Sequence, residues 1–185
     1  MAKVIYSMSV SLDGFVEDAS GSIEFSAPDD EVHQRANDET RETSAFLFGR
    51  RLYEVMEEPW RAMAAQDDLP DIPAEFARIY METPRFVFSD TLESVPEGVH
   101  LVRRADSESV VRRLKEESEG LLGIGGPTLA ASLFDFIDEF RLNVVPVILG
   151  GGKSYFPAGR QVDLELVEER RFPSGTVYLR FQRAG

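Results

Sequence analysis

The residues best suited to chemistry in this 185-residue chain lie where apolar segments run into glycines. Leu121–Pro127 reads L-L-G-I-G-G-P, and an apolar, helix-like pattern follows it. Glycine lets a backbone pass close to a ligand, and proline suits the first turn of a helix. The free N–H groups and the positive dipole end of such a helix can bind a phosphate. A glycine turn can equally serve only for packing, and the spacing here is neither G-x-G-x-x-G nor a P-loop.

Arginine pairs mark two similar places. Arg50–Arg51 follows Gly49 at the end of a short apolar segment, and Arg103–Arg104 ends another apolar segment, whereas Arg112–Arg113 falls inside a helix-like pattern. Each pair can be a solvated face. The pairs are informative because the chain carries a net charge of −13, and the first two stand out because they lie beside a glycine or a strand end. That charge argues against a nucleic-acid partner, which requires a basic surface.

Several classes of site are excluded by composition. Without cysteine the chain has no disulfide, catalytic thiol or cysteine-ligated metal, and its two histidines, His33 and His100, make no familiar zinc set. No G-x-S-x-G occurs, which argues against a serine hydrolase. No segment approaches 18 consecutive apolar residues, and the N-terminus lacks an apolar signal region. We therefore expect a cytoplasmic protein with no metal and no membrane partner.

Hydrophobic periodicity predicts alternating strands and helices over the first 149 residues. The expected strands are 3–10, 45–48, 85–89, 99–103, 121–124 and 139–149. The expected helices are 28–44, which Ser26 can cap, then 50–57, 74–82, 107–118 and 128–136. The three prolines in 59–73 predict a long loop. Pro146 places the strand 139–149 at a sheet edge or a bulge.

The remaining segments 164–172 and 176–182 flank P-S-G and predict an antiparallel hairpin. The order of elements predicts an α/β fold with a mostly parallel central sheet, helices on both faces and an antiparallel C-terminal edge. We expect residues 1–185 to form a single domain.

Five motifs in order resemble one family. They are S-L-D-G-F (11–15), F-L-F-G-R-R-L-Y-E-V-M (46–56), R-F-V-F-S (85–89), G-I-G-G-P-T-L (123–129) and D-E-F-R-L-N-V-V-P-V-I-L-G-G-G (138–152). Together they are similar to the dihydrofolate reductase-like family. The closer likeness is to the branch with the reductase domain of the bifunctional riboflavin-biosynthesis deaminase-reductase. The resemblance implies a three-layer fold and an NADPH-dependent reductase, without a deaminase half.

The resemblance also implies where NADPH binds. Gly49 and Arg50, with Arg51 beside them, meet the cofactor phosphates. Ser89 lies beside the adenosine 2′-phosphate, and Arg103 or Arg104 supplies it with positive charge. The turn that lies against the pyrophosphate consists of Gly125, Gly126, Pro127 and Thr128, and its glycine pair is often joined by a cis peptide in the family. Met8 and Ser9 back the nicotinamide. Taken singly, Ser89 can start a turn, Met8 can be core, and Arg51 can be a solvated helix residue.

The substrate side is less closely matched. Asp30 takes the position of the proton-donating acid of folate reductases, and Asp13 matches an aspartate of the riboflavin branch. His33 can exchange a proton near neutral pH. Trp60 can wall the substrate pocket, and Lys153 can bind a substrate phosphate. Alternatively, Asp30 is favourable helix N-terminal charge, Trp60 is core and Lys153 is a surface lysine.

Three functions remain open from the sequence. The leading one is NADPH-dependent reduction of a phosphoribosylamino-pyrimidine of riboflavin synthesis or a relative of it. The second is reduction of a pterin or dihydrofolate, and the third is NADPH or ligand binding without turnover. Members of the riboflavin branch pair as dimers through this C-terminal region. The resemblance and the partly protected strand edge thus predict a homodimer that buries part of Leu142–Leu149 and the hairpin.

Overall fold

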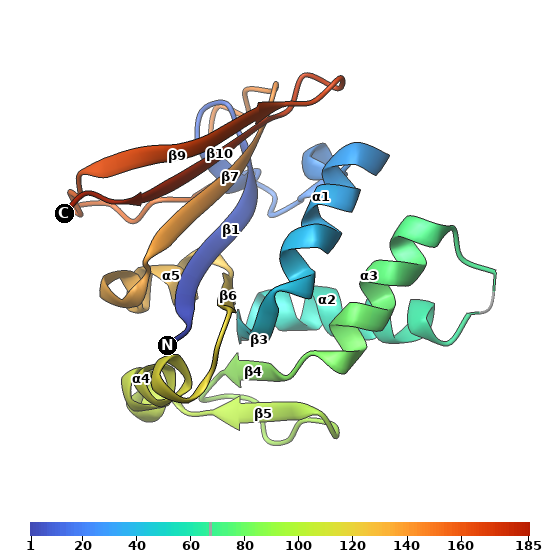
Figure 1. Ribbon diagram of the computed structural model, residues 1–185, viewed down its shortest axis with the longest axis vertical. Helices are drawn as coiled ribbons and strands as arrows, with labels where there is room; N and C mark the ends of the chain where they lie inside the picture. The colour runs from blue at the N-terminus through green and yellow to red at the C-terminus, as the bar shows by residue number, and fades with distance from the viewer. Residues whose placement is uncertain (67) are drawn as a thin grey trace.

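An eight-stranded, mostly parallel sheet forms the centre of the molecule (Figure 1). The computed structural model describes residues 1–66 and 68–185. The strand order is β5-β4-β3-β6-β1-β7-β10-β9, and β10 runs antiparallel to both of its neighbours, β7 and β9. The bounds are β1 Lys3–Ser11, β3 Thr43–Gly49, β4 Arg85–Phe88, β5 Val99–Val102, β6 Leu121–Gly125, β7 Glu139–Val145, β9 Leu164–Arg171 and β10 Val177–Arg183. The short strands β2 (Phe15–Glu17) and β8 (Lys153–Ser154) pair separately.

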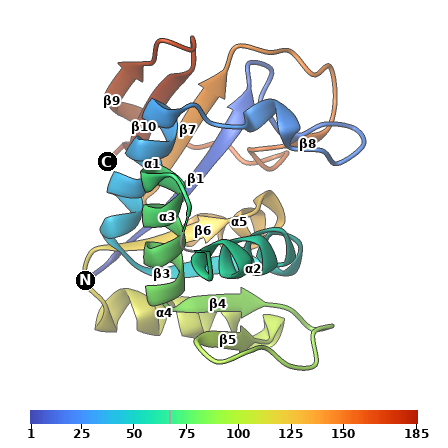
Figure 2. The same ribbon diagram turned by 90° about the vertical axis from the view of Figure 1, so that its right-hand side faces the viewer.

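Helices cover both faces of the sheet, which confirms the three-layer α/β fold (Figures 1 and 2). One face carries α1 (Asp30–Arg41), α2 (Arg50–Ala64) and α3 (Asp71–Glu82), and the other carries α4 (Ser107–Glu117) and α5 (Pro127–Ser132). Short 3-10 turns lie at Glu24–Ser26, Arg104–Asp106 and Phe134–Phe136. Strands β4 and β6 are largely apolar, as expected for parallel strands with both faces covered, whereas β1 and β7 also carry polar residues.

Two apolar clusters hold the layers together. The larger one packs the even-numbered residues of β1 against α4 and α5, with Leu122, Leu129 and Phe140 among its members. The smaller one joins β3 and β4 to α2 and α3 through residues such as Phe48 and Tyr80. Together the two clusters join helices on both faces to the sheet.

The predicted loop 59–73 is too long, because only residues 65–70 separate two helices, and residue 67 among them lies outside the described residues. Helix α2 continues through Pro59 to Ala64, and α3 begins at Asp71 with Pro73 in its first turn. A proline in the first turn loses no helical hydrogen bond, because the N–H there has no intrahelical partner. The interior Pro59 does lose one, but its ring is exposed and the following Trp60 packs on Phe76 of α3. Packing between the two helices therefore outweighs the proline.

Two further boundaries differ from expectation. Asp29, rather than Ser26, caps α1 by accepting the Val32 N–H at 2.8 Å, and the helix ends at Arg41 so that the next strand can begin at Thr43. The strand predicted at 139–149 stops at Val145, one residue before Pro146.

Pro146 also predicts a sheet edge or a bulge for this strand, and the first of these alternatives is wrong. Strand β7 lies between β1 and β10, because the C-terminal hairpin folds back beside it. Pro146 needs no ladder hydrogen bond, since it follows the last paired residue. The edges of the sheet are β5 and β9.

Candidate functional site

A cleft of about 770 Å³ lies at the carboxyl ends of the parallel strands. It runs from Met8 on β1, past the first turns of α2 and α5, to Ser89 and Thr91 after β4. Open parallel sheets bind ligands at this edge, because the connecting loops and helix N-termini gather there. Its lining combines apolar side chains with arginines, carboxylates and backbone amides.

Two helices begin at this cleft. Gly49 is the N-cap of α2 and Gly126 is the N-cap of α5, and neither helix has a side chain that caps it. The first N–H groups of a helix have no intrahelical partner, and the dipole favours an anion beside them. Pro127 occupies the first position of α5, and Thr128 follows it at the cleft wall. The expected strand–glycine–helix turns are thus both present.

The paired glycines differ in their surroundings. Gly126 lines the cleft with φ at +98°, a backbone conformation that favours glycine. Gly125 does not line it, and a Cβ there would collide with Leu52 and lie 2.7 Å from Phe48 Cδ1. The described residues contain no cis peptide bond, so the bond joining the two glycines is trans. Gly125 serves packing, and Gly126 faces the cleft.

Arg50 and Arg51 both line the cleft but are held differently. Arg50 Nη1 donates to Thr91 Oγ1 at 2.9 Å, and its Nε lies 3.3 Å from Glu54 Oε1. Arg51 Nη1 lies 3.2 Å from Glu17 Oε1 on β2. The Arg50 side chain therefore lies beside the N-terminus of α2, whereas the Arg51 side chain extends toward β2, which follows the turn after β1.

The structure separates the second arginine pair. Arg103 donates to the carbonyl oxygens of Ser89 and Leu92 at 2.9 and 2.8 Å, and it does not line the cleft. Arg104 does line it, with its Nε 3.7 Å from Asp90 Oδ2. Both arginines were candidates to place charge beside a phosphate. Only Arg104 lies at the cleft, whereas Arg103 stabilises the turn after β4.

Ser89 lies at the same turn and is almost fully buried. Its hydroxyl accepts the backbone N–H groups of Thr91 and Leu92 at 3.2 and 3.1 Å. These bonds are typical of a serine that starts a turn. Ser89 therefore shapes the turn while also lining the cleft.

The two predicted nicotinamide contacts point to opposite faces of β1. Met8 lines the cleft and packs with the cluster beneath α5. Successive strand residues alternate between faces, so Ser9 lies with Ser7 on the other face. That face meets α1, since Arg141, the register partner of Ser7, contacts Glu39 of α1. Ser9 is not among the residues that line the cleft.

Neither predicted acid lines the cleft. Asp13 accepts the backbone N–H groups of Leu149 and Gly150 at 3.1 and 2.8 Å, so it ties the turn after β1 to the loop after β7. A hydrogen bond with the Ser11 hydroxyl, together with those two amides, holds the pKa of Asp13 below its ordinary value. Asp30 is exposed in the first turn of α1, where its charge favours the helix.

His33 and Trp60 come together, but under α1 rather than in the cleft. Their ring centroids are 6.1 Å apart, and both rings pack on Phe76 of α3. Burial lowers the pKa of His33, while the nearby charge of Asp30 partly opposes that change. The two rings form part of the packing between α1, α2 and α3.

Lys153 lines the cleft from β8, where it pairs with Glu17 of β2. Sequence reasoning missed Glu17, and it also missed Asp90 and Glu108, which line the opposite end. The pairing of β2 with β8 joins segments more than 130 residues apart and leaves no local signal. Among the missed residues, only Asp90 had a local sequence signal, because it directly follows Ser89, which was predicted to bind the cofactor.

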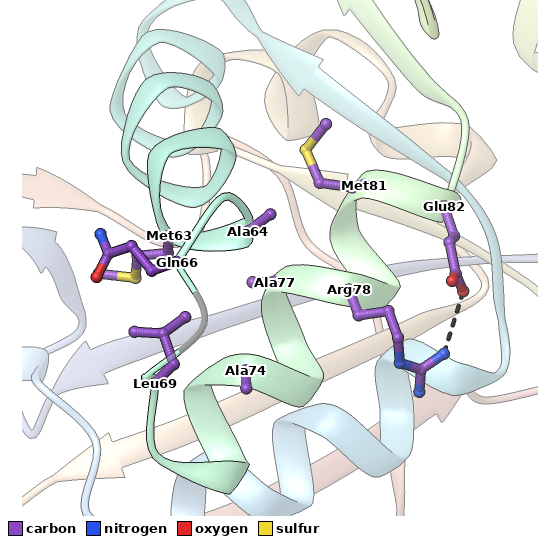
Figure 3. Close-up of a pocket in the computed structure, with 9 residues that line it drawn as sticks. All are labelled: Met63, Ala64, Gln66, Leu69, Ala74, Ala77, Arg78, Met81 and Glu82. Atoms are coloured by element: carbon purple, nitrogen blue, oxygen red, sulfur yellow. Dashed lines mark hydrogen bonds and ion pairs between the residues drawn. The ribbon is translucent and has the colours of Figure 1, made fainter.

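A second, smaller hollow of about 250 Å³ lies between the end of α2 and α3 (Figure 3). Small apolar residues such as Ala74 and Ala77 line it, with an Arg78–Glu82 ion pair of 3.2 Å at its side. None of the predicted site residues belongs to it. Across residues 1–66 and 68–185, no group of three or more His, Asp or Glu side chains is arranged to hold a metal ion. No helix in the same ranges is long and apolar enough to span a membrane.

Comparison with known proteins gives one relative in sequence and several in structure. The chain is 26% identical over 180 residues to the uncharacterised protein YyaP of Bacillus subtilis, covering 96% of this chain and 93% of that protein. A protein of Shewanella sp. PV-4 whose name links it to riboflavin biosynthesis superposes with a TM-score of 0.75 at 20% identity, and each chain is fully covered.

Two other solved structures share the fold. The deaminase/5-amino-6-(5-phosphoribosylamino)uracil reductase of Thermotoga maritima superposes with a TM-score of 0.71 at 15% identity, covering 99% of this chain and 57% of that one. Dihydrofolate reductase of Enterococcus faecalis, complexed with NADP(H), superposes with a TM-score of 0.63 at 14% identity, covering 99% of this chain and 97% of that one. A family profile, the RibD C-terminal domain, matches residues 2–178. On that match over nearly its whole length, the chain belongs to the RibD C-terminal domain family.

Proposed function

We propose that this protein is an NADPH-dependent reductase that transfers hydride to a pyrimidine or pterin-type heterocycle. One observation carries the proposal: two uncapped helix N-termini and three arginines converge on one cleft in a strongly acidic chain. Backbone amides at helix N-termini and arginine side chains are the groups that bind phosphates. Membership of the RibD C-terminal domain family supports the same reading.

The residues present fit a dinucleotide. Gly49 and Gly126 present no side chain where α2 and α5 begin, so a pyrophosphate can approach both helices. Met8 and Val16 offer an apolar surface at the β1 end, where a nicotinamide ring can lie. When bound, NADPH supplies the hydride, and the chain orients the reactants and excludes water.

The substrate end is the part of the cleft around Glu17 and Lys153. Lys153 offers a positive charge to a substrate phosphate, as a phosphoribosylamino-pyrimidine carries. Glu17 also lines the cleft and directly follows Val16, one of the two residues of the apolar surface. We propose a phosphorylated pyrimidine of riboflavin synthesis, or a relative of it, ahead of a pterin.

A dinucleotide titration followed by turnover tests the proposal. Enhancement of nicotinamide fluorescence reports binding, and loss of reduced-nicotinamide absorbance reports turnover. Because each charge-assisted hydrogen bond contributes about 1.5–3 kcal/mol, NADPH should bind at least about ten-fold tighter than NADH. Equal affinities at low salt would contradict NADPH as the cofactor.

A second candidate function is NADPH binding without turnover. The observation that favours it is that Asp13 and Asp30, the predicted acids, lie outside the cleft. Tight NADPH binding without oxidation across a panel of pyrimidines and pterins would select this second function.

A further inference from the structure

The end of the cleft beyond β4 carries two carboxylates, although a site for a phosphate needs only positive charge. Asp90 follows Ser89, and Glu108 lies in the first turn of α4, and both line the cleft together with Arg50 and Arg104. Two carboxylates and two guanidinium groups thus line this end of the cleft. An end that balances its charge in this way attracts a phosphate less strongly than the arginines alone would.

Asp90 and Arg104 make a specific arrangement there. Asp90 Oδ1 accepts the backbone N–H of Arg104 at 2.9 Å, and Oδ2 lies 3.7 Å from Arg104 Nε. Their side chains are 53% and 74% exposed, so solvent screens the pair. Exposed ion pairs contribute little free energy, so a ligand with a stronger charge can separate the two side chains.

The two side chains match the two alternatives at the adenosine ribose. In dinucleotide sites a carboxylate accepts the ribose 2′-hydroxyl of NAD, whereas an arginine binds the 2′-phosphate of NADP. Here Asp90 follows the end of β4 and Arg104 follows the end of the neighbouring β5, and both line the same end of the cleft.

We propose that Asp90 sets the discrimination between NADPH and NADH, an inference that rests on the proposed function. With NADPH, Arg104 leaves Asp90 and pairs with the 2′-phosphate, which the remaining carboxylate repels. With NADH, the Asp90 carboxylate accepts the 2′-hydroxyl while Arg104 stays beside it. Asp90 therefore limits the preference for NADPH and keeps NADH as a usable ligand.

The test measures the dissociation constants of NADPH and NADH for Asp90→Asn, Arg104→Ala and the double variant. Asp90→Asn should bind NADPH about two- to five-fold more tightly and NADH about two- to five-fold more weakly, as expected for one exposed charge. Arg104→Ala should weaken NADPH roughly ten-fold or more and leave NADH nearly unchanged. In the double variant, the gain in NADPH affinity should shrink, because no guanidinium remains for Asp90 to restrain.

Glu93→Gln is the matched control. Glu93 is exposed three residues after Asp90 and lies outside the cleft, so this change removes the same charge without the same contact. Its NADPH/NADH ratio should equal that of the wild type.

Three results would overturn the inference. They are an unchanged ratio in Asp90→Asn, a shift no larger than that of Glu93→Gln, and, in Glu108→Gln measured alongside, a shift that Asp90→Asn does not show. If wild type binds NADPH and one of these appears, only the inference fails. If wild type binds neither dinucleotide, the proposed function fails with it.

Discussion

Gly125 and Gly126 are neighbours in sequence with separate roles, and substitution can tell them apart. A Cβ at Gly125 would enter the space of Leu52 and Phe48, so Gly125→Ala should overpack the start of α2. Overpacking of this kind costs about 1–3 kcal/mol. The melting temperature should therefore fall by several degrees, at roughly 2–4 °C per kcal/mol for a chain of this size.

Gly126→Ala should act on binding instead. The nearest atom to its new Cβ is Leu52 Cβ at 3.7 Å, an ordinary contact, but φ at +98° disfavours any side chain. Relaxing that angle would reorient the first N–H groups of α5 at the cleft. We expect NADPH affinity to fall about ten-fold or more, because one charge-assisted hydrogen bond to the cofactor would be lost. Unchanged affinity in a folded Gly126→Ala variant would show that this turn only packs.

At the residue scale, sequence could predict side chains that sit next to glycines and strand ends. Gly49, Arg50 and Gly126 were placed in this way, because a local turn and the following helix determine their position. The partners of such residues could not be predicted. Arg103 and Arg104 are equivalent in a sequence, and only the backbone after β4 decides that Arg104 faces the cleft.

The contact between α1 and α3 is an element-scale feature with a pH dependence. Glu75 of α3 accepts hydrogen bonds from Arg41, Gln34 and Asn37 of α1. These bonds, that from Arg41 foremost, lower the pKa of Glu75 to about 2. A carboxyl whose folded pKa is lowered stabilises the fold above its unfolded pKa and loses that effect as pH falls through the folded value.

Glu75→Gln should therefore destabilise the protein at pH 7 by about 1 kcal/mol, the usual net value of a hydrogen bond in partly exposed surroundings. The difference in melting temperature between wild type and variant should narrow as pH falls from about 5 toward about 2, between the unfolded and folded pKa values. Thermal melts followed by circular dichroism at several pH values measure it.

Glu82→Gln in the same helix is the control, because the Arg78–Glu82 pair has side chains 61% and 64% exposed. It should leave the melting temperature almost unchanged at each pH. If the difference in melting temperature between wild type and Glu75→Gln stays constant down to pH 2, the effect of the substitution is due to packing rather than charge.

Strand and helix order was predictable because the buried strands are apolar and the helices follow glycine or polar turns. The errors fall where tertiary packing overrides local rules. Pro59 predicts a break, but contacts of α2 with α3 extend the helix past it. Pro146 predicts an edge, but the hairpin from the end of the chain pairs with β7, and nothing near residue 146 reports that pairing.

At the scale of the whole molecule, β9 is the exposed edge at the C-terminal side of the sheet. Every residue of β9 after Leu164 is exposed, including Leu166 at 46% and Val167 at 42%. Open edges with apolar side chains favour pairing with another chain. Of the surface predicted for the dimer, Leu142–Val145 is paired with β1 and β10, so we propose a homodimer that pairs through the other predicted part, the hairpin, at its edge strand β9.

Light scattering at micromolar concentration tests the dimer. Wild type should show twice the 20.8 kDa mass of one chain, and Leu166→Lys with Val167→Lys should return it to one, because a two-fold interface brings the added charges of both chains together. Leu12→Lys with Ile148→Lys is the control, since these residues are also exposed, at 64% and 71%, but lie at the turn after β1 and the loop after β7. Loss of the dimer in the control alone would move the interface to that end of the molecule. A wild-type mass of 20.8 kDa would rule the dimer out, and each chain would then carry its complete cleft alone.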